Sequence, residues 1–189
     1  MNKKTCEWPR NNPNMVAYHD TEWGVPLYND RKLFEFIILD AFQAGLSWSI
    51  VLNKRKGFKK AFANFNPAKI SLFDYKKIKE LAKNPKIIRN KLKIRATVDN
   101  AKTFLKIQKE FGSFDKYIWQ FVNFKPRVNK WKSLRQLPAR SRESDAMSKD
   151  LKKRGFKFVG TTICYAFMQA AGLVNDHTVD CFRYREVQK

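Results

Sequence analysis

The chain contains only two histidines, and each has a cysteine in the same part of the sequence. Cys6 accompanies His19 near the start, and Cys181 follows His177 by four residues near the end. Two cysteines and two histidines form a ligand set typical of structural zinc, and four protein ligands leave no position for a reacting water. The i, i+4 spacing of His177 and Cys181 predicts one face of a helical turn. The pattern therefore predicts one structural zinc ion that joins the two ends of the chain. Two unrelated buried cysteines and two ordinary histidines remain an open alternative, because regular zinc-finger spacings are absent.

One carboxylate has an unusual setting. Asp40 shares a predicted helical face with Leu33, Ile37 and Ala44, and its neighbours in the sequence are apolar. Burial of an ionised carboxylate is costly unless a partner or ligand compensates it. We therefore consider Asp40 a candidate catalytic residue, while a bond to a backbone amide or to an arginine remains an equal alternative.

Aromatic residues in predicted turns suggest a flat ligand. Tyr18 and Trp23 flank His19, and Trp48 directly follows a turn that contains Gly45. Nucleobases stack on aromatic side chains with about 1–3 kcal/mol per base, and a cationic base would also be attracted by the ring faces. Tyr18, Trp23 and Trp48 are thus candidate base-binding residues, although each one alone is more typical of a hydrophobic core.

The composition favours a polyanionic partner. The formal net charge is +22, and phosphate contacts of lysine and arginine supply most non-specific affinity for DNA. Lys153, Arg154 and Lys157 precede a predicted helix that begins near Thr161, where free backbone amides would favour a phosphate. A second basic turn, residues 84–94, would join two helices as a helix-hairpin-helix anchor, although the usual hairpin glycine is missing. A lysine-rich solvated surface is the alternative for all of these charges.

Apolar residues recur at helical spacing through most of the chain, which predicts a nearly all-α fold. We expect a single unit, residues 1–189, with two lobes. A zinc-bound lobe would contain both ends of the chain, a central helical lobe would cover about residues 30–125, and a binding cleft would separate them. The predicted helix signals are an N-cap at Asp30, an end at Gly45, a cap at Ser47, a capping box at 71–74, one helical face from Ile87 to Leu105, an end at Gly112, a start at Ser113, a basic helix ending at Gly155 and a last helix at 161–172.

Several classes of protein are disfavoured by what the sequence lacks. It contains no apolar run of about 18 residues that would predict a membrane span and no apolar stretch near Met1 typical of a signal peptide. We therefore expect a cytoplasmic protein, and we take a monomer as the default. Nucleophile-elbow, Walker and His-Glu-x-x-His motifs are also absent. If both histidines bind metal, no histidine is left to act as a general base.

Three segments closely resemble the DNA-3-methyladenine glycosylase I family. They are YHDTEWGVP at 18–26, QAGLSW at 43–48 and KKRGFKFVGTTICYAFMQAAGLVNDH at 152–177, and the likeness extends over nearly the whole chain. It implies a helix-hairpin-helix glycosylase fold with zinc bound by Cys6, His19, His177 and Cys181. It also implies base-excision repair, in which a flipped 3-methyladenine is cut from double-stranded DNA that contains alkylated bases.

The resemblance also assigns roles to site residues. Trp48 and Tyr18 would stack on the base, Trp23 would line the pocket, and Leu46, beside Gly45, would wedge into the gap that the flipped base leaves in the duplex. Methylation makes the base cationic and weakens its bond to the sugar, so that finding and flipping it is the main task. The superfamily's usual catalytic aspartate after the hairpin is not expected in this family.

Two positions depart from the family pattern. Asp40 stands where the family generally has a glutamate that hydrogen-bonds the edge of the base, and Met15 stands where some relatives have an aromatic residue. Because of these departures, we also consider a non-catalytic protein of the same fold that binds damaged DNA. A zinc-stabilised basic DNA-binding protein that needs no base pocket is a further alternative.

Overall fold

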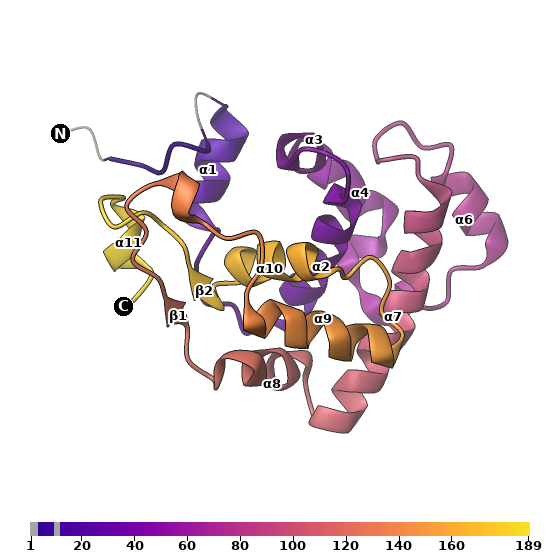
Figure 1. Cartoon of the computed structure of the whole chain (residues 1–189). Helices are drawn as coiled ribbons and strands as arrows, with labels where there is room; N and C mark the ends of the chain where they lie inside the picture. Colours follow the sequence, from indigo (N-terminus) through magenta and orange to yellow (C-terminus); the bar gives the residue numbers. More distant parts are fainter. Residues whose placement is uncertain (1–3, 10–11) are drawn as a thin grey trace.

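Helix α2, Asp30–Gln43, lies at the centre of the molecule, and ten of its 14 residues are buried. The computed structural model describes residues 4–9 and 12–189. Helix α2 packs against α10, α7 and α8, which belong to distant parts of the sequence (Figure 1). The remaining helices are α1 Pro13–Thr21, α3 Trp48–Asn53, α4 Arg55–Ala61, α5 Pro67–Ile70, α6 Tyr75–Leu81, α7 Lys91–Phe111, α8 Phe114–Trp119, α9 Arg142–Arg154, α10 Thr161–Ala170 and α11 Arg183–Glu186. Short 3₁₀ helices occur at Ala63–Phe65, Gln120–Val122 and Leu134–Gln136.

The predicted nearly all-α architecture is confirmed. The described strands, β1 Arg127–Val128 and β2 Val174–Asn175, form one short parallel pair with Arg127 opposite Val174. This pair ties the connection between α8 and α9 to the segment that follows α10. Among the described residues, no helix combines the length and the apolar character needed to cross a membrane.

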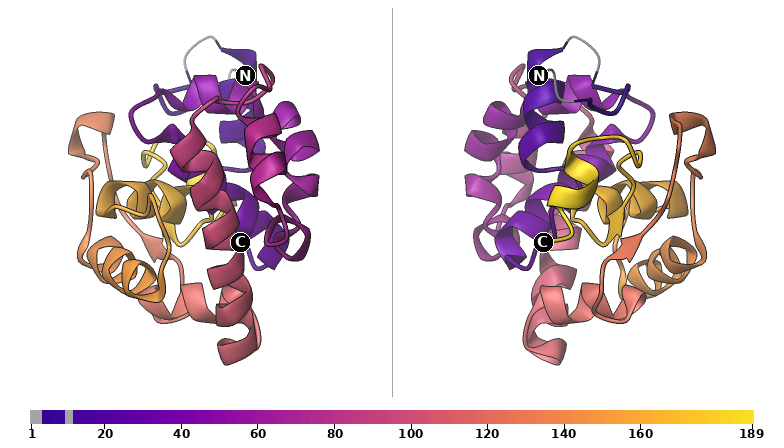
Figure 2. Two further views of the ribbon diagram at one scale, coloured as in Figure 1. Left: turned by 90° about the vertical axis from the view of Figure 1, so that its right-hand side faces the viewer. Right: turned by 90° about the vertical axis from the view of Figure 1, so that its left-hand side faces the viewer.

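The two ends of the chain lie on the same side of the molecule. The backbone amide of Phe182 donates to the carbonyl of Lys4 at 2.8 Å. In the right-hand view of Figure 2, the indigo of α1 and the yellow of the C-terminal segment are adjacent. Segments from both ends are therefore available to build one site.

Several predicted helix ends are confirmed. Gly112 and Gly155 end α7 and α9 in the left-handed conformation, with φ of 85° and 105°. The side chain of Ser113 caps α8 by accepting from the amide of Lys116. Ser47 is the N-cap of α3, but its hydroxyl contacts Ser49 at 3.0 Å and bonds no backbone amide of that helix.

Other predicted boundaries are wrong. Asn29, not Asp30, caps α2, and the Asp30 carboxylate instead accepts from the amides of Phe114 and Asp115 at the start of α8. The expected capping box at 71–74 is two separate caps, because Ser71 ends α5 and Asp74 begins α6. The long helical face starts at Lys91, so the loop before it contains Ile87, and α10 ends two residues before Gly172.

The hairpin between α6 and α7 rests directly on helix α4. A Cβ atom added to Gly57 would lie 2.1 Å from the carbonyl oxygen of Lys86, so that only glycine permits this approach of the two backbones. The ammonium group of Lys54 donates to the carbonyl of Pro85 at 2.7 Å. The basic turn at residues 84–94 is thus fixed against the body of the fold.

Candidate active site and metal centre

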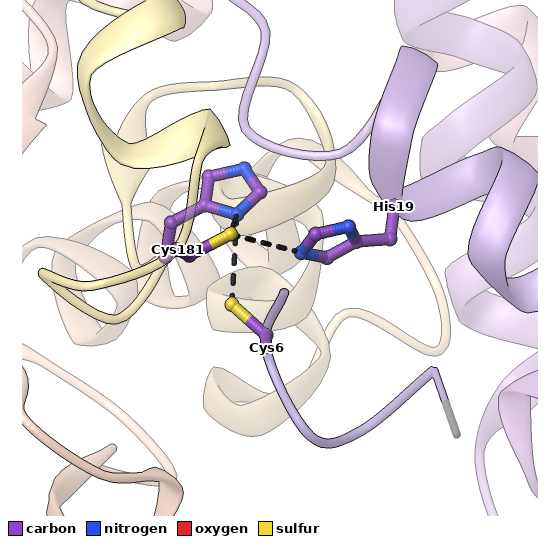
Figure 3. Close-up of side chains that lie close together, drawn as sticks. Cys6, His19 and Cys181 are labelled. Atoms are coloured by element: carbon purple, nitrogen blue, oxygen red, sulfur yellow. Dashed lines mark hydrogen bonds between the residues drawn. The ribbon is translucent and has the colours of Figure 1, made fainter. Parts of the chain in front are cut away.

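Cys6, His19, His177 and Cys181 meet in one buried cluster, and their ligand atoms all lie within 4.8 Å of one another. Figure 3 shows the labelled side chains of Cys6, His19 and Cys181 converging from separate segments. The Sγ atom of Cys181 lies 3.6 Å from His19 Nε2 and 3.6 Å from His177 Nδ1, and Cys6 Sγ lies 3.6 Å from His177 Nδ1. The cluster could hold a metal ion.

The second nitrogen of each histidine ring is already bonded to a neighbouring group. His19 Nδ1 lies 2.7 Å from the Asp20 carboxylate, and His177 Nε2 lies 3.1 Å from the carbonyl oxygen of Trp23. Because oxygen atoms of this kind accept, these nitrogens carry the protons and leave Nε2 of His19 and Nδ1 of His177 facing the cluster. Such outer partners are typical of metal-binding histidines, because they fix the tautomer and the direction of the ring.

His177 and Cys181 share a turn rather than the predicted helix. The amide of Cys181 donates to the carbonyl of Thr178 at 2.9 Å, and the segment 177–181 contains no helix. The expectation of a helical turn was therefore wrong, although the four-residue spacing does bring both side chains to one point. Gly24 is also required here, because a Cβ atom at this position would lie 2.9 Å from His177 Nε2.

The predicted base-binding residues line one cavity of about 240 Å³. This is less than the roughly 300–1,000 Å³ of pockets for drug-sized ligands, and it suits a single flat ring system. Its walls come from α1, α2, α3, α10 and the connection between β1 and α9. The lining residues are Trp8, Met15, Tyr18, Trp23, Asp40, Gln43, Trp48, Leu134, Leu137, Ala166 and Gln169.

Polar atoms in the cavity wall lack partners within the described chain. They are Oδ2 of Asp40 and the indole Nε1 atoms of Trp8 and Trp48. Asp40 is only 2% exposed, and burial raises the pKa of its carboxyl group well above 3.8. An unpaired buried polar group costs about 1–3 kcal/mol, and such groups in a cavity mark a ligand site. The wall thus offers an acceptor and indole donors to a ligand.

The aromatic side chains of the cavity wall pack against one another. The Tyr18 and Trp48 rings have centroids 5.2 Å apart at 49°, and Trp8 packs edge-on against Trp23 at 5.1 Å. Burial, and then the charge of Asp40, hold the pKa of Tyr18 well above its usual range, so its hydroxyl stays protonated. Trp48 is only partly buried, which leaves part of its ring surface open to the cavity.

A network of ion pairs fixes the helices that carry these aromatic residues. The Arg55 guanidinium binds Glu22 with two hydrogen bonds of 2.6 and 2.8 Å and donates to Glu35 at 2.6 Å. Glu22 immediately precedes Trp23, Glu35 lies on α2, and Arg55 begins α4. Hydrogen bonds from Arg55 and Lys32 lower the pKa of Glu22 against the opposing effect of burial. The network ties the end of α1 to the helix that presents Asp40.

The turn after α2 projects an apolar side chain. Gly45 has a φ of 78°, and Leu46 is 38% exposed. The ammonium group of the buried Lys93 donates to the carbonyls of Phe42 and Ala44 at 2.9 and 2.5 Å. These carbonyls belong to the end of α2, which has no intrahelical donor for them. Lys93, on α7, therefore anchors the turn that carries the predicted wedge.

The three basic residues predicted to contact DNA lie outside the cavity wall and differ in their surroundings. Lys153 is exposed on α9, and Lys157 is exposed but pairs with Asp99 at 2.7 Å. The Arg154 guanidinium bonds both Asp150 and Glu110. Arg154 also lies 5.0 Å from the ring centroids of Phe111 and Tyr117, so its guanidinium has structural partners on several sides.

The structure adds cavity residues that the sequence did not single out. Gln43 lies one helical turn after Asp40, and that spacing would have identified it. Gln169 lies one turn after Ala166 within the motif at 152–177, but nothing in the motif separates a lining residue from a core residue. Trp8 comes from an irregular segment without periodicity, so the sequence offered no signal for it.

Comparisons with known proteins identify the family to which the chain is similar. A family model described as methyladenine glycosylase matches residues 8–184. The chain is 47% identical to the DNA-3-methyladenine glycosylase 1 of Escherichia coli (strain K12) over 179 residues, which cover 95% of this chain and 96% of that protein. It is also 47% identical to the DNA-3-methyladenine glycosylase of Haemophilus influenzae over 176 residues, 93% of this chain and 95% of the relative.

Solved structures show the same fold. A crystal structure of 3-methyladenine DNA glycosylase I superimposes with a TM-score of 0.93 at 47% identity and covers 95% of this chain and 98% of the other. A structure that addresses 3-methyladenine recognition by the Staphylococcus aureus enzyme gives a TM-score of 0.92 at 35% identity, over 94% and 95% of the two chains. Both matches cover nearly the whole length of this chain.

Proposed function

This chain belongs to the methyladenine glycosylase family, and from that premise we propose that it excises 3-methyladenine from double-stranded DNA. The proposal rests on one observation: Oδ2 of Asp40 is buried in the wall of an aromatic cavity and has no hydrogen-bond partner in the described structure. A base methylated at position 3 is cationic before it leaves the sugar. It would supply the charge and the N–H donors that this carboxylate lacks, and its presence would lower the pKa of Asp40.

The chemical step needs little from the protein. The bond between the base and C1′ breaks, its electron pair leaves with the base, and the base departs as a neutral molecule. A water oxygen bonds to C1′ and releases one proton to solvent. Asp40 would hold the flipped base by its edge, while Tyr18 and Trp48 offer ring faces and Trp23 closes the wall.

Extraction of the base from the duplex is the costly part. Unstacking and unpairing cost a few kcal/mol, and the cost is smaller for a damaged base. Leu46, fixed beside Gly45 and exposed at the tip of its turn, would fill the gap in the stack. Lys153 and Lys157 would lie toward the phosphate backbone, for which the net charge of +22 is favourable, while Arg154 would hold its acidic partners Asp150 and Glu110.

Asp40 is one methylene shorter than the glutamate that is general in the family. Its carboxylate would sit about 1.5 Å further back, which is enough to replace a direct hydrogen bond by one through water. We therefore propose that Asp40 recognises the base either through a water or after a small shift of the base toward α2.

We propose that the cluster of Cys6, His19, His177 and Cys181 binds one zinc ion. Tetrahedral bonds of about 2.3 Å to sulfur and about 2.0–2.1 Å to nitrogen place S and N atoms about 3.6 Å apart. Three of the distances between Sγ atoms and ring nitrogens, from Cys6 to His177 and from Cys181 to His19 and His177, are 3.6 Å. Bound zinc would supply no catalysis, because the four protein ligands occupy every position. It would join the two ends of the chain.

We further propose that the whole chain acts as one unit of two lobes, with the cavity at their junction. One lobe would contain both ends of the chain and contribute Tyr18 and Gln169. The other would be the central helices, about residues 30–125, and contribute Asp40 and Trp48. A monomer suffices, since one chain contains every lining residue of the cavity. Because the substrate is DNA, we place the enzyme in the cytoplasm.

The proposal is tested by chromatography of the bases released from methylated duplex DNA. The wild-type protein should release 3-methyladenine selectively, and Asp40→Asn should release it at least about tenfold more slowly, the loss expected for one charged hydrogen bond. Asp74→Asn is the matched control, because Asp74 is exposed at the cap of α6 and asparagine caps equally well. Equal rates for Asp40→Asn and the wild type would refute the role of Asp40.

Assays of alkali-sensitive sites and of DNA binding, run beside the chromatography, separate the alternative functions. A non-catalytic protein of this fold would bind the lesion without producing alkali-sensitive abasic sites. A basic DNA-binding protein without a base pocket would bind undamaged and damaged duplexes equally, with affinity that falls steeply as the salt concentration rises. Either outcome would overturn the glycosylase proposal.

A further inference from the structure

Asp176 is fully buried, and its carboxylate accepts four hydrogen bonds. Oδ1 accepts from Asn129 Nδ2 and Trp131 Nε1, both at 2.7 Å. Oδ2 accepts from the Tyr165 hydroxyl at 2.7 Å and from Gln169 Nε2 at 2.8 Å. The side chain of Asp176 is 0% exposed, so these bonds compensate its burial. Of the four donors, Gln169 alone lines the base cavity.

The bond to Asp176 fixes the direction of the Gln169 amide. Nε2 is the atom of Gln169 that lies 2.8 Å from Oδ2 of Asp176, so the amide turns its nitrogen toward Asp176. The carbonyl oxygen of the same amide then points away from Asp176. Gln169 is only half-buried because it borders the cavity. Its carbonyl oxygen has no bond to Asp176 and is thus available as an acceptor for a ligand in the cavity that Gln169 lines.

We propose that Gln169 reads the base by accepting a hydrogen bond from the exocyclic amine at position 6 of methyladenine, and that Asp176 is the positioning residue that fixes its amide. This inference rests on the proposed function. The cavity would then contain two acceptors from two helices, the carboxylate of Asp40 on α2 and the carbonyl of Gln169 on α10. An exocyclic amine has two N–H groups and can satisfy both.

The arrangement predicts discrimination between methylated purines. Guanine has a carbonyl oxygen at position 6, so 3-methylguanine would place an acceptor against one or both acceptors of the cavity. A site that hydrogen-bonds its ligand rejects a ligand without the matching group, because polar atoms are then left unpaired. The bond to Asp176 makes this rejection stricter, since turning the Gln169 amide over would break that bond and set its carbonyl oxygen against the Asp176 carboxylate.

Asp176 also supports another part of the cavity wall, so a substitution of Asp176 changes more than the orientation of the Gln169 amide. Through Asn129 and Trp131 it holds the connection from β1 to α9, residues 129–141, which places Leu134 and Leu137 in the cavity wall. Substitution of Asp176 would therefore disturb that wall as well as the amide. Gln169→Met is the decisive variant, because methionine has a similar length but offers no carbonyl acceptor.

The test measures the affinities of the free bases 3-methyladenine and 3-methylguanine through quenching of tryptophan fluorescence. Trp8, Trp23 and Trp48 lie in the cavity wall, so either base should quench their emission. We expect Gln169→Met to bind 3-methyladenine about tenfold more weakly, the equivalent of about 1.4 kcal/mol, and 3-methylguanine no more weakly than the wild type does. The ratio of the two affinities is the readout, because a general loss of structure lowers both.

Two further variants separate positioning from stability. Asp176→Asn should lower the same ratio, because its amide can also donate and allows Gln169 to turn over. Tyr165→Phe is the matched control: it removes one bond to the same Asp176 oxygen but leaves the Gln169 bond in place, so the ratio should stay at the wild-type value. If Asp176→Asn does not fold, the result for Gln169→Met decides.

The outcomes distinguish this inference from the proposed function. A wild-type protein that releases and prefers 3-methyladenine, together with an unchanged ratio in Gln169→Met, would overturn the role of Gln169 and leave the glycosylase function intact. A wild-type protein that releases no 3-methyladenine would instead overturn the proposed function. A ratio lowered in Tyr165→Phe as much as in Asp176→Asn would show that Asp176 acts through stability alone.

Discussion

Nε2 of His177 donates to the carbonyl oxygen of Trp23 at 3.1 Å, and this bond connects the metal-ligand cluster to the base cavity. The same tryptophan packs against the His177 ring, with centroids 4.6 Å apart, and its indole lines the cavity. The position of a cavity wall therefore depends directly on the orientation of a proposed zinc ligand.

Removal of the metal should loosen both sites together. We expect about one zinc per purified chain, and Cys181→Ser should bind less zinc and lower Tm by more than about 10 °C, since a structural zinc site supplies folding free energy. Because Trp23 is coupled to His177, the variant should also bind free 3-methyladenine more weakly at a temperature where it is still folded. Metal analysis, thermal unfolding and fluorescence titration measure these effects.

Cys164→Ser is the matched control for this prediction. Cys164 is also buried, but it lies on α10, contacts the carbonyl of Val159 and is outside the cluster. Its substitution should leave the zinc content at the wild-type value. An equal loss of zinc in both variants, or full base affinity in zinc-depleted Cys181→Ser, would contradict the coupling.

Lys93→Met should impair flipping without affecting the free base. The variant loses two hydrogen bonds from a buried ammonium group to the end of α2, which should destabilise the protein by about 1–3 kcal/mol. It should also free the turn that carries Leu46. We expect weaker binding to duplex DNA with an abasic site and unchanged affinity for free 3-methyladenine. Lys102→Met, an exposed lysine on the same helix, should change neither affinity.

Asp40→Asn should stabilise the protein, and the gain should depend on pH. Burial raises the pKa of this carboxyl above 3.8 in the folded state, so the folded protein retains a proton that the unfolded chain has lost. The free energy of unfolding of the wild type therefore falls as pH rises through the folded pKa. Asparagine does not ionise and avoids this loss.

Thermal unfolding between pH 5 and 8 checks the prediction for Asp40. The difference in Tm between Asp40→Asn and the wild type should be positive at pH 8 and should shrink toward acid pH. Asp74→Asn serves as the control, because Asp74 is exposed at a helix cap. A difference that grows toward acid pH would mean that the folded state lowers the pKa of Asp40.

The two neighbouring basic residues of α9 should behave differently. Lys153→Ala should reduce the slope of log K against log salt concentration for DNA binding by about 0.9, the value for one phosphate contact. Arg154→Ala should leave the slope nearer to the wild-type value and instead lower Tm, because its guanidinium bonds Glu110 and Asp150. A reduced slope with unchanged Tm in Arg154→Ala would favour a direct phosphate contact.

The sequence predicted those parts of the site whose signals are chemical. Four residues of rare types predicted a cluster that the structure brings together and that could hold a metal ion, even though they come from distant segments. Asp40 was identified because a charged residue interrupts an apolar helical face, and its burial confirms that reasoning. The all-α class followed from the spacing of apolar residues, which depends on local geometry alone.

The features of the fold and the site that the sequence did not predict depend on tertiary contacts, and local sequence patterns do not reveal such contacts. Asp30 was expected to cap its own helix, but its carboxylate reaches the start of α8, far along the chain. Arg154 belongs to a basic run that suggests DNA, yet acidic and aromatic partners from α7, α8 and α9 surround it. The bond between Gln169 and Asp176 joins a helix to a later strand end, and no periodicity marks it.

The proposed metal cluster also sets the order in which the protein becomes active during synthesis. Cys6 and His19 leave the ribosome early, but their partners His177 and Cys181 follow more than 150 residues later. Until then the early thiol and imidazole lack two of the proposed ligands of the cluster, and Trp23 lacks its contact with the His177 ring. A nascent chain that stalls before Cys181 therefore carries most of the basic residues without a complete metal cluster, so that translation of the turn at residues 177–181 is the final assembly step of the proposed zinc site.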